Sequence, residues 1–101
     1  EDMSLAKYRY YANEICRKNQ LSRTEFEILL FGYDYEYINR RSLDVYVPCS
    51  HSTLKMALYS LVKEQYLKVI RERAHHKSRL YTLTRKSKMM INKFYKQLNI
   101  N

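Results

Sequence analysis

The sequence predicts one mainly α-helical domain that carries a small β-hairpin near its C-terminal end. Its 101 residues are 46% hydrophobic, which is enough to form one core. One glycine and one proline are too few for long linkers or for a sandwich of tight turns. Apolar residues recur mostly three and four positions apart, and alternate only in two short segments towards the end of the chain.

The first helix is expected over residues 4–19, and the second begins at about Arg23. Ser22 is followed three residues later by Glu25, which is the capping-box pattern of a helix N-terminus. The second helix should end at Gly32 or slightly beyond. Residues 34–38 fit either a short strand or an extension of that helix. The apolar stripes are Leu5, Tyr8, Ala12, Ile15 and Cys16 in the first helix, and Phe26, Leu29, Leu30 and Tyr33 in the second.

A short third helix is expected to begin after Asn39, a favourable N-cap residue, and to carry Leu43 and Val47 on its apolar side. Residues 45–47 have strand-favouring side chains, which argues against the helix. Pro48 must interrupt it, because the residue before a proline disfavours the α conformation.

Ser50 is the N-cap candidate for a fourth helix, over residues 51–64. This helix has one apolar side and one polar side, as expected at a domain surface. The apolar side contains Leu54, Ala57, Leu58 and Leu61, and the polar side contains Ser52, Lys55, Tyr59 and Lys63.

Residues 66–71 and 79–84 alternate with a period of two, which predicts two strands joined by a basic loop over residues 72–78. Thr84 is then the N-cap of a last helix. Its expected buried stripe is Met90, Ile91, Phe94, Tyr95 and Leu98.

The net charge of +9 is very unevenly distributed. Residues 1–50 sum to −1, whereas residues 51–101 sum to +10. A field of this sign and asymmetry attracts polyanions, and contacts between Lys or Arg and phosphates would add free energy from counterion release. Charge alone leaves open whether the basic half binds nucleic acid or is simply a solvated surface.

The order of the elements favours nucleic acid. Two helices joined by a three-residue turn and followed by a two-stranded hairpin form a winged helix-turn-helix, whose second helix enters the major groove. Here the two helices are residues 40–47 and 51–64, with residues 48–50 as the turn. The basic loop 72–78 stands where the wing would reach a neighbouring groove or the backbone.

The chain resembles the MarR family of winged-helix transcription regulators from Leu21 to about Phe94. LSRTEFEIL at residues 21–29 is similar to the family's entry into its second helix. The segment STLKMALYSL at 52–61, followed by YLK at 66–68, is similar to its recognition helix and the next strand. RLYTLTRKSK at 79–88 is similar to the end of the wing and the start of the following helix.

The sequence departs from the family pattern at three points. Pro48 replaces the glycine that usually precedes the recognition helix, and Gln65 replaces the glycine that usually ends it. The tip of the wing has no glycine. The chain is also shorter than most members, with one helix at each end for the dimer interface that the resemblance implies.

The resemblance implies a double-stranded DNA-binding regulator that acts as a homodimer through its terminal helices, with no cofactor and no catalytic role. The helix that begins at His51 would present Ser52, Thr53, Lys55, Met56 and Tyr59 to base edges in the major groove. Arg40, Arg41 and Lys63 would contact phosphates. Arg73, Lys77 and Arg79 would anchor the wing in or beside the minor groove, and His75 and His76 would contact DNA or face solvent.

We expect one domain over residues 1–101, made of an N-terminal helix (1–20), a winged helix-turn-helix (21–84) and a C-terminal helix (85–101). No apolar run is long enough to span a bilayer, and residues 1–20 lack the apolar stretch of a secretory signal. These observations predict a cytoplasmic protein, or one of the host cytoplasm if the source is viral. Whether a small-molecule effector exists is not readable from the residues.

Other chemistry has little support in the sequence. Cys16 and Cys49 form neither a CxxC nor a Cys/His cluster, so both are expected to be buried free thiols rather than metal ligands or a disulfide. In the resembled family a first-helix cysteine can sense peroxide, but Cys16 also completes an apolar stripe, and packing is preferred. His75 and His76 lack a third metal ligand nearby. No phosphate-binding loop, HExxH or GxSxG is present, so an enzyme is not expected.

Two further functions compete with a duplex-binding regulator. One is a winged helix that docks a protein partner. The other is a single-strand binder that stacks bases on some of the eleven tyrosines. Tyr8, Tyr33, Tyr66 and Tyr95 match apolar periodicities, so packing is preferred to base stacking for these four.

Overall fold

A computed structural model describes residues 5–47, 49–70 and 79–99. It contains the helices and strands that the sequence predicts, in the expected order, with one additional short strand. The elements are α1 (Leu5–Asn19), α2 (Arg23–Asp34), β1 (Ile38–Asn39), α3 (Arg40–Tyr46), α4 (His51–Lys63), β2 (Leu67–Ile70), β3 (Leu80–Leu83) and α5 (Arg85–Asn99).

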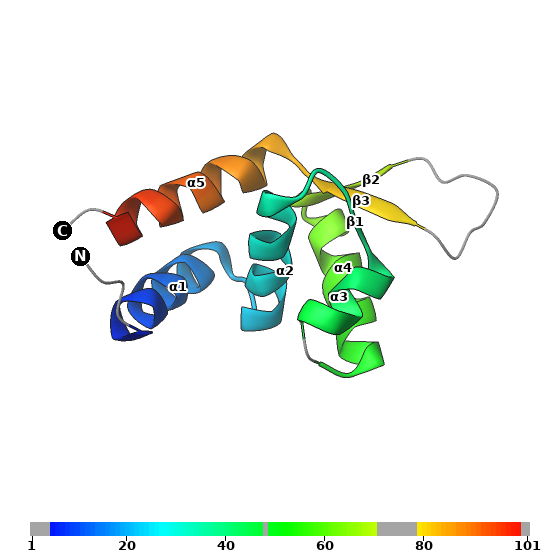
Figure 1. Cartoon of the computed structure of the whole chain (residues 1–101), viewed down its shortest axis with the longest axis horizontal. Helices are drawn as coiled ribbons and strands as arrows, with labels where there is room; N and C mark the ends of the chain where they lie inside the picture. The colour runs from blue at the N-terminus through cyan, green and yellow to red at the C-terminus, as the bar shows by residue number, and fades with distance from the viewer. Residues whose placement is uncertain (1–4, 48, 71–78, 100–101) are drawn as a thin grey trace.

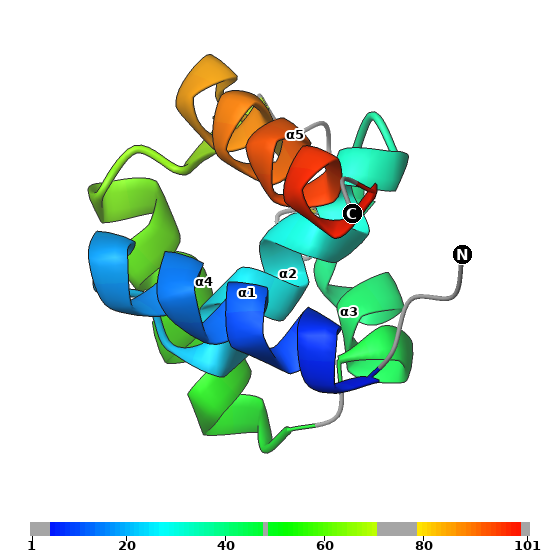
Figure 2. The same ribbon diagram turned by 90° about the vertical axis from the view of Figure 1, so that its left-hand side faces the viewer.

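The elements separate into two ends of the molecule (Figure 1). Helices α1 and α5 lie at the end where both termini are found, and β2 and β3 extend towards the opposite end. Figure 2 shows α1 and α5 side by side, with α2 behind them. Helices α3 and α4 lie below the sheet in the view of Figure 1, away from α5. Because α1 packs against α5 at one end, α3, α4 and the strands β2 and β3 form the surface at the other end of the molecule.

Helices α2, α3 and α4 each begin at a polar cap, and so does α5, where the Ser87 amide donates to Thr84 Oγ1 at 3.4 Å. Ser22 Oγ accepts from the Glu25 amide at 3.1 Å while the Glu25 carboxylate accepts from the Ser22 amide at 2.8 Å, so the predicted capping box is confirmed. Asn39 Oδ1 accepts from the Ser42 amide at 2.9 Å, and Ser50 Oγ accepts from the Thr53 amide at 3.1 Å. Each bond satisfies a helix N–H group that has no partner within its own helix.

Helix α4 ends in a Schellman motif, which directs the chain from the helix into β2. The Gln65 amide donates to the Val62 carbonyl at 3.1 Å, and the Tyr66 amide donates to the Leu61 carbonyl at 2.8 Å. Gln65 has φ of 66°, in the left-handed region where glycine is usual. Gln65 therefore adopts the left-handed conformation that a glycine at this position would adopt more easily.

The three strands form an antiparallel sheet in the order β1-β3-β2. Ile38 pairs with Tyr81 and Leu67 pairs with Leu83, so β3 is the central strand. The sequence left residues 34–38 open between strand and helix. In the structure Asp34 ends α2 and Ile38 begins β1, and residues 35–37 connect the two without regular structure. The Thr82 hydroxyl also donates to the Glu36 carbonyl at 2.9 Å, which fixes this connection to the sheet.

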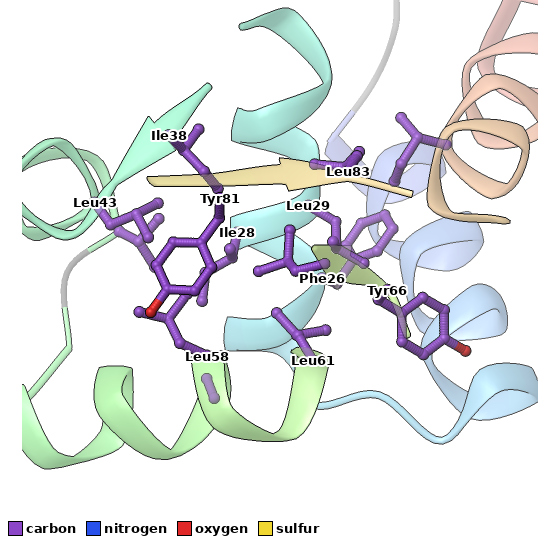
Figure 3. Packing of buried hydrophobic residues seen from close by; sticks show 14 of the residues in the cluster. Phe26, Ile28, Leu29, Ile38, Leu43, Leu58, Leu61, Tyr66, Tyr81 and Leu83 are labelled. Atoms are coloured by element: carbon purple, nitrogen blue, oxygen red, sulfur yellow. The ribbon is translucent and has the colours of Figure 1, made fainter. Parts of the chain in front are cut away.

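One hydrophobic core joins the helices to the sheet (Figure 3). Tyr81 projects from β3 between Leu43 of α3 and Leu58 of α4, as the close-up shows. Phe26 of α2 lies edge-on to Phe94 of α5, with ring centroids 5.0 Å apart. The recognition-helix candidate α4 is thus held against the sheet by its apolar side, as predicted from Leu54, Ala57, Leu58 and Leu61, all of which are buried.

Some details of the sequence prediction are wrong. Both cysteines are free, as predicted, and Cys16 is partly buried against the core, but Cys49 is exposed in the turn before α4 rather than buried. Leu5 is 62% exposed although it begins the apolar stripe of α1. Residues 45–46 are helical despite their preference for strands, because the Asn39 cap and burial of Leu43 stabilise α3.

Candidate nucleic-acid interface

The polar side of α4 is exposed, as an interface with DNA requires. Met56 is 71% exposed although it is large and apolar, and the aromatic Tyr59 is 70% exposed. Lys55 is exposed on the same side of the helix, and Lys63 is exposed at its end. Because the opposite side of α4 is packed in the core, a partner can approach these side chains without unfolding the helix.

The N-terminus of α4 presents exposed hydroxyl groups that are already connected to one another. Ser50 Oγ donates to Thr53 Oγ1 at 2.7 Å, and lies 3.4 Å from Ser52 Oγ. Thr53 accepts in its bond with Ser50 and therefore keeps its own hydroxyl proton for another acceptor. Ser52 and Thr53 are both exposed, so the predicted base-reading positions lie together at the first turn of α4.

Arg40 connects α3 to the start of α4. Its Nη2 lies 3.0 Å from His51 Nδ1 and 2.7 Å from His51 Nε2, and donates to the His51 carbonyl at 3.2 Å. A guanidinium can only donate, so Arg40 is the donor to His51. Arg40 therefore positions α4 relative to α3, a role that sequence reasoning did not assign to it. Arg41 is exposed on the same short helix.

The far end of α4 is fixed to the start of α5. Lys86 Nζ donates to the Glu64 carbonyl at 3.0 Å and lies 4.2 Å from the centroid of the Tyr66 ring. The Thr84 hydroxyl donates to the Gln65 carbonyl at 2.8 Å, and the Ser87 hydroxyl donates to the Tyr66 carbonyl. A cation beside the last carbonyls of a helix is favourable, because that end carries a partial negative charge.

The base of the hairpin adds further cations. Arg79 is exposed immediately before β3, and Lys68 is exposed on β2. Sequence reasoning did not include Lys68, although its place in an alternating strand marked it as solvent-facing. Arg73, His75, His76 and Lys77 lie outside the described residues, so the structure places none of these four.

Burial perturbs several titratable groups away from this surface. It raises the pKa of the Cys16 thiol, while the nearby Arg23 opposes that rise. Cys16 Sγ also lies 3.9 Å from the Ser22 carbonyl, to which it donates. A protonated thiol is a poor nucleophile, which supports the packing interpretation of Cys16. Burial likewise raises the pKa values of Tyr8, Tyr66 and Tyr95.

The four tyrosines singled out in the sequence all pack against the core. Tyr66 is buried, and Tyr8, Tyr33 and Tyr95 are partly buried against the core cluster. Tyr59 on α4 differs, because it is exposed on the surface predicted to contact DNA. Over residues 5–47, 49–70 and 79–99, no cluster of His, Cys, Asp or Glu is arranged to hold a metal ion. No helix in those same ranges is both long and apolar enough to cross a membrane.

Comparisons with known proteins place the fold. No protein-family model matches the sequence, and the search of curated proteins finds no significant match. Solved structures do match. The transcriptional regulator Tm0710 from Thermotoga maritima has a TM-score of 0.78 at 20% identity, over 90% of this chain and 64% of that one. A MarR-family transcriptional regulator from Silicibacter pomeroyi has a TM-score of 0.73 at 16% identity, over 93% of this chain and 63% of that one.

A structure of reduced AbfR bound to DNA also matches, with a TM-score of 0.73 at 15% identity over 88% of this chain and 66% of that one. The chain thus has the winged helix-turn-helix fold, and specifically the form of it found in MarR-family regulators. This confirms the fold that the sequence motifs indicated. The chain spans about two thirds of the length of these structures.

Proposed function

We propose that this chain binds double-stranded DNA as a transcription regulator, with α4 in the major groove. The observation that carries the proposal is the exposed side of α4, where Met56, Tyr59 and Lys55 project from a helix whose other side is fixed in the core. Hydroxyl groups and lysine can bond to base edges, and Met56 can contact a thymine methyl group. The DNA-bound AbfR structure, which shares the fold, supports this assignment.

The hairpin and α3 supply the contacts with the DNA backbone in this proposal. Arg40, Arg41 and Lys63 bind phosphates on either side of the groove, and Arg79 anchors the base of the wing. Arg73, His75, His76 and Lys77 lie outside the described residues, and we propose that they contact the same DNA beside Arg79. The sequence asymmetry supports this arrangement, because residues 51–101 carry a net charge of +10.

We further propose that the protein is a homodimer through α1 and α5, acting in the cytoplasm. These helices lie together at the end of the molecule farthest from the wing (Figure 1). They expose Leu5, Tyr10 and Met89, each more than half accessible. Exposed apolar side chains on two adjoining helices support a surface that associates. A twofold dimer would present two copies of α4 to successive turns of one DNA face.

Alanine substitution of the exposed residues of α4 tests the major-groove assignment. Met56→Ala and Tyr59→Ala should each weaken binding to a duplex selected from a random library by about tenfold, since a good base contact contributes about 1–3 kcal/mol. Fluorescence anisotropy with labelled duplex gives the dissociation constants, and circular dichroism checks that each variant is folded.

Tyr35→Ala is the matched control, because it removes a tyrosine that is also more than half exposed but follows α2, outside α4 and outside the proposed dimer helices. Loss of DNA affinity should be confined to the α4 variants when all proteins are compared as dimers. Equal affinity of the α4 variants and the wild-type protein would exclude α4 as the reading helix.

A further inference from the structure

A small hollow lies between α3, α4 and the sheet, and it brings together cations from three separate elements. Arg40 of α3, Lys55 of α4 and Arg79 before β3 all line this cavity, whose volume is about 230 Å³. Tyr59 lines it as well, while Val69 and Tyr81 contribute apolar surface from β2 and β3. The three cations are far apart in the sequence, so only the fold gathers them at one place.

Arg40 supplies a second, independent observation at this hollow. Its Nη2 is bonded to His51, but its Nε is buried and has no hydrogen-bond partner among the described residues. It is the one buried side-chain nitrogen or oxygen in residues 5–47, 49–70 and 79–99 that lacks a partner. A buried donor without an acceptor is unfavourable, so the Arg40 guanidinium beside the hollow favours a ligand that supplies acceptor oxygens.

The chemistry of the lining indicates what the hollow accepts. Guanidinium and ammonium groups donate strong hydrogen bonds to phosphate oxygens, and the tyrosine hydroxyl of the exposed Tyr59 can add another. The apolar surface of Val69 and Tyr81 suits the carbon face of a sugar rather than the edge of a base. A phosphodiester with its deoxyribose combines these two characters.

We propose that this hollow is a receptor for one sugar–phosphate unit of the DNA backbone, bound jointly by Arg40, Lys55 and Arg79. The proposal rests on the DNA-binding function and changes one part of it. Lys55, which the sequence assigned to base edges, becomes a residue that positions the protein on the backbone. The three cations then share a single phosphate instead of neutralising three.

Salt-dependent titrations distinguish a shared phosphate from separate ones. Lys55→Gln, Arg79→Gln and the double variant are compared with Lys88→Gln, a control that removes an exposed lysine from α5. Lys55 and Arg79 are themselves exposed, so these changes leave the core intact. Each single variant should bind duplex about tenfold more weakly, since it loses a charge-assisted hydrogen bond to the phosphate.

If the phosphate is shared, the double variant should bind little more weakly than either single variant. Its salt slope should fall by no more than about one unit in total, because both removed cations contact the same phosphate and Arg40 still contacts it. If the double variant lost affinity by the product of the two single losses, and its salt slope fell by about two units, Lys55 and Arg79 would contact two separate phosphates. That result would overturn the proposal. The proposal would also be overturned if Lys55→Gln weakened binding only to duplexes that carry one particular base at one position, because Lys55 would then read a base and not bind the backbone.

A second measurement needs no DNA, and therefore separates this proposal from the proposed function. Inorganic phosphate is titrated into the full chain at constant ionic strength, and the amide resonances of Val69 and Tyr81 are followed by NMR. Saturable shifts are expected in the wild-type protein and in Lys88→Gln, and their loss is expected in the double variant. Saturable shifts in a protein that does not bind duplex DNA would refute the DNA-binding function but not the phosphate-binding hollow. Duplex binding by a wild-type protein whose shifts do not saturate with phosphate would refute the hollow.

Discussion

Gln65 has a left-handed backbone conformation in which a side chain is normally unfavourable. Its φ of 66° is required by the Schellman motif that ends α4. A residue with a Cβ atom loses about 1–2 kcal/mol in this conformation, whereas glycine does not. Part of that gain would be offset by the greater freedom of glycine in the unfolded chain.

Gln65→Gly should therefore raise the free energy of unfolding by about 0.5–1 kcal/mol, which urea denaturation can measure. Glu64→Gly is the matched control, because the adjacent residue has φ of −88° and gains nothing from glycine. It should lower the stability instead. Stabilisation by both substitutions, or by neither, would contradict the strain assigned to position 65.

The partly buried tyrosines predict how stability changes with pH. Burial raises the pKa values of Tyr8, Tyr66 and Tyr95 above the ordinary value of 10.0. The unfolded chain consequently loses these protons at a lower pH than the folded chain does. Their contribution is fully present below pH 10, and it is lost as the pH rises through the folded-state values.

The melting temperature should thus decline as the pH rises above about 10. Thermal denaturation followed by circular dichroism gives the melting temperature across this range. The variant Tyr8→Phe/Tyr95→Phe should decline less steeply, because two of the shifted groups are removed. An identical decline in the variant would show that these two hydroxyl groups do not cause it.

At the scale of the element, the N-caps of α2 and α4 are the same kind of bond with different consequences. Ser22 and Ser50 each accept from the amide three residues on. Ser22→Ala and Ser50→Ala should each lower the free energy of unfolding by about 1 kcal/mol. Denaturant titration measures this loss for both.

Only Ser50→Ala should also weaken binding to duplex DNA, because Ser50 organises the first turn of α4 and bonds to Thr53. The Ser22 variant serves as its control, since α2 presents no residue to the proposed interface. A similar loss of DNA affinity in both variants would attribute the effect to general stability rather than to the shape of the recognition helix.

The elements themselves were largely predictable, because their signals are local. Capping residues such as Ser22, Asn39 and Ser50 fix the helix starts, and the burial of one face follows from apolar spacing. Strand β1 could not be predicted from the sequence, because two residues are too few to show a periodicity. It forms by pairing with Tyr81 and Leu80 of β3, which are far away in the sequence.

The site was predictable only as a set of exposed residues on α4. Exposure of Lys55, Met56 and Tyr59 follows from the amphipathic pattern of the helix. The Arg40–His51 contact and the hollow shared by Lys55 and Arg79 depend on how three elements meet. Neither relationship has a signature within a short stretch of sequence.

At the scale of the whole molecule, the two ends have different proposed roles, and the bond network at the start of α5 joins them. Lys86 and Ser87 tie α5 to the end of α4. If α1 and α5 form the dimer interface, the orientation of α4 is fixed relative to that interface. Spacing between the two recognition helices would then be set by the fold.

Charged substitutions at the end formed by α1 and α5 test this arrangement. Leu5→Asp and Met89→Asp should each weaken self-association by about tenfold or more, as for truncation of a central interface residue. Analytical ultracentrifugation over a range of protein concentrations gives the dissociation constant. Val45→Asp is the control, because Val45 is 71% exposed on α3, away from this end.

A monomeric wild-type protein at all concentrations would refute the dimer, as would equal dissociation by Val45→Asp. DNA binding by a monomer would remain compatible with the exposed side of α4. The dimer and the major-groove assignment are therefore tested separately.

The most direct test of the central claim is the salt dependence of binding to duplex DNA, compared with the single strand of the same sequence. Fluorescence anisotropy of the full chain at several salt concentrations gives both affinities. A protein that contacts six to ten phosphates loses about 10³–10⁵ in affinity between about 50 and 200 mM salt. We predict tighter binding to the duplex, with a steep decline of this kind. Absence of duplex binding, or equal or tighter binding to the single strand, would contradict the account.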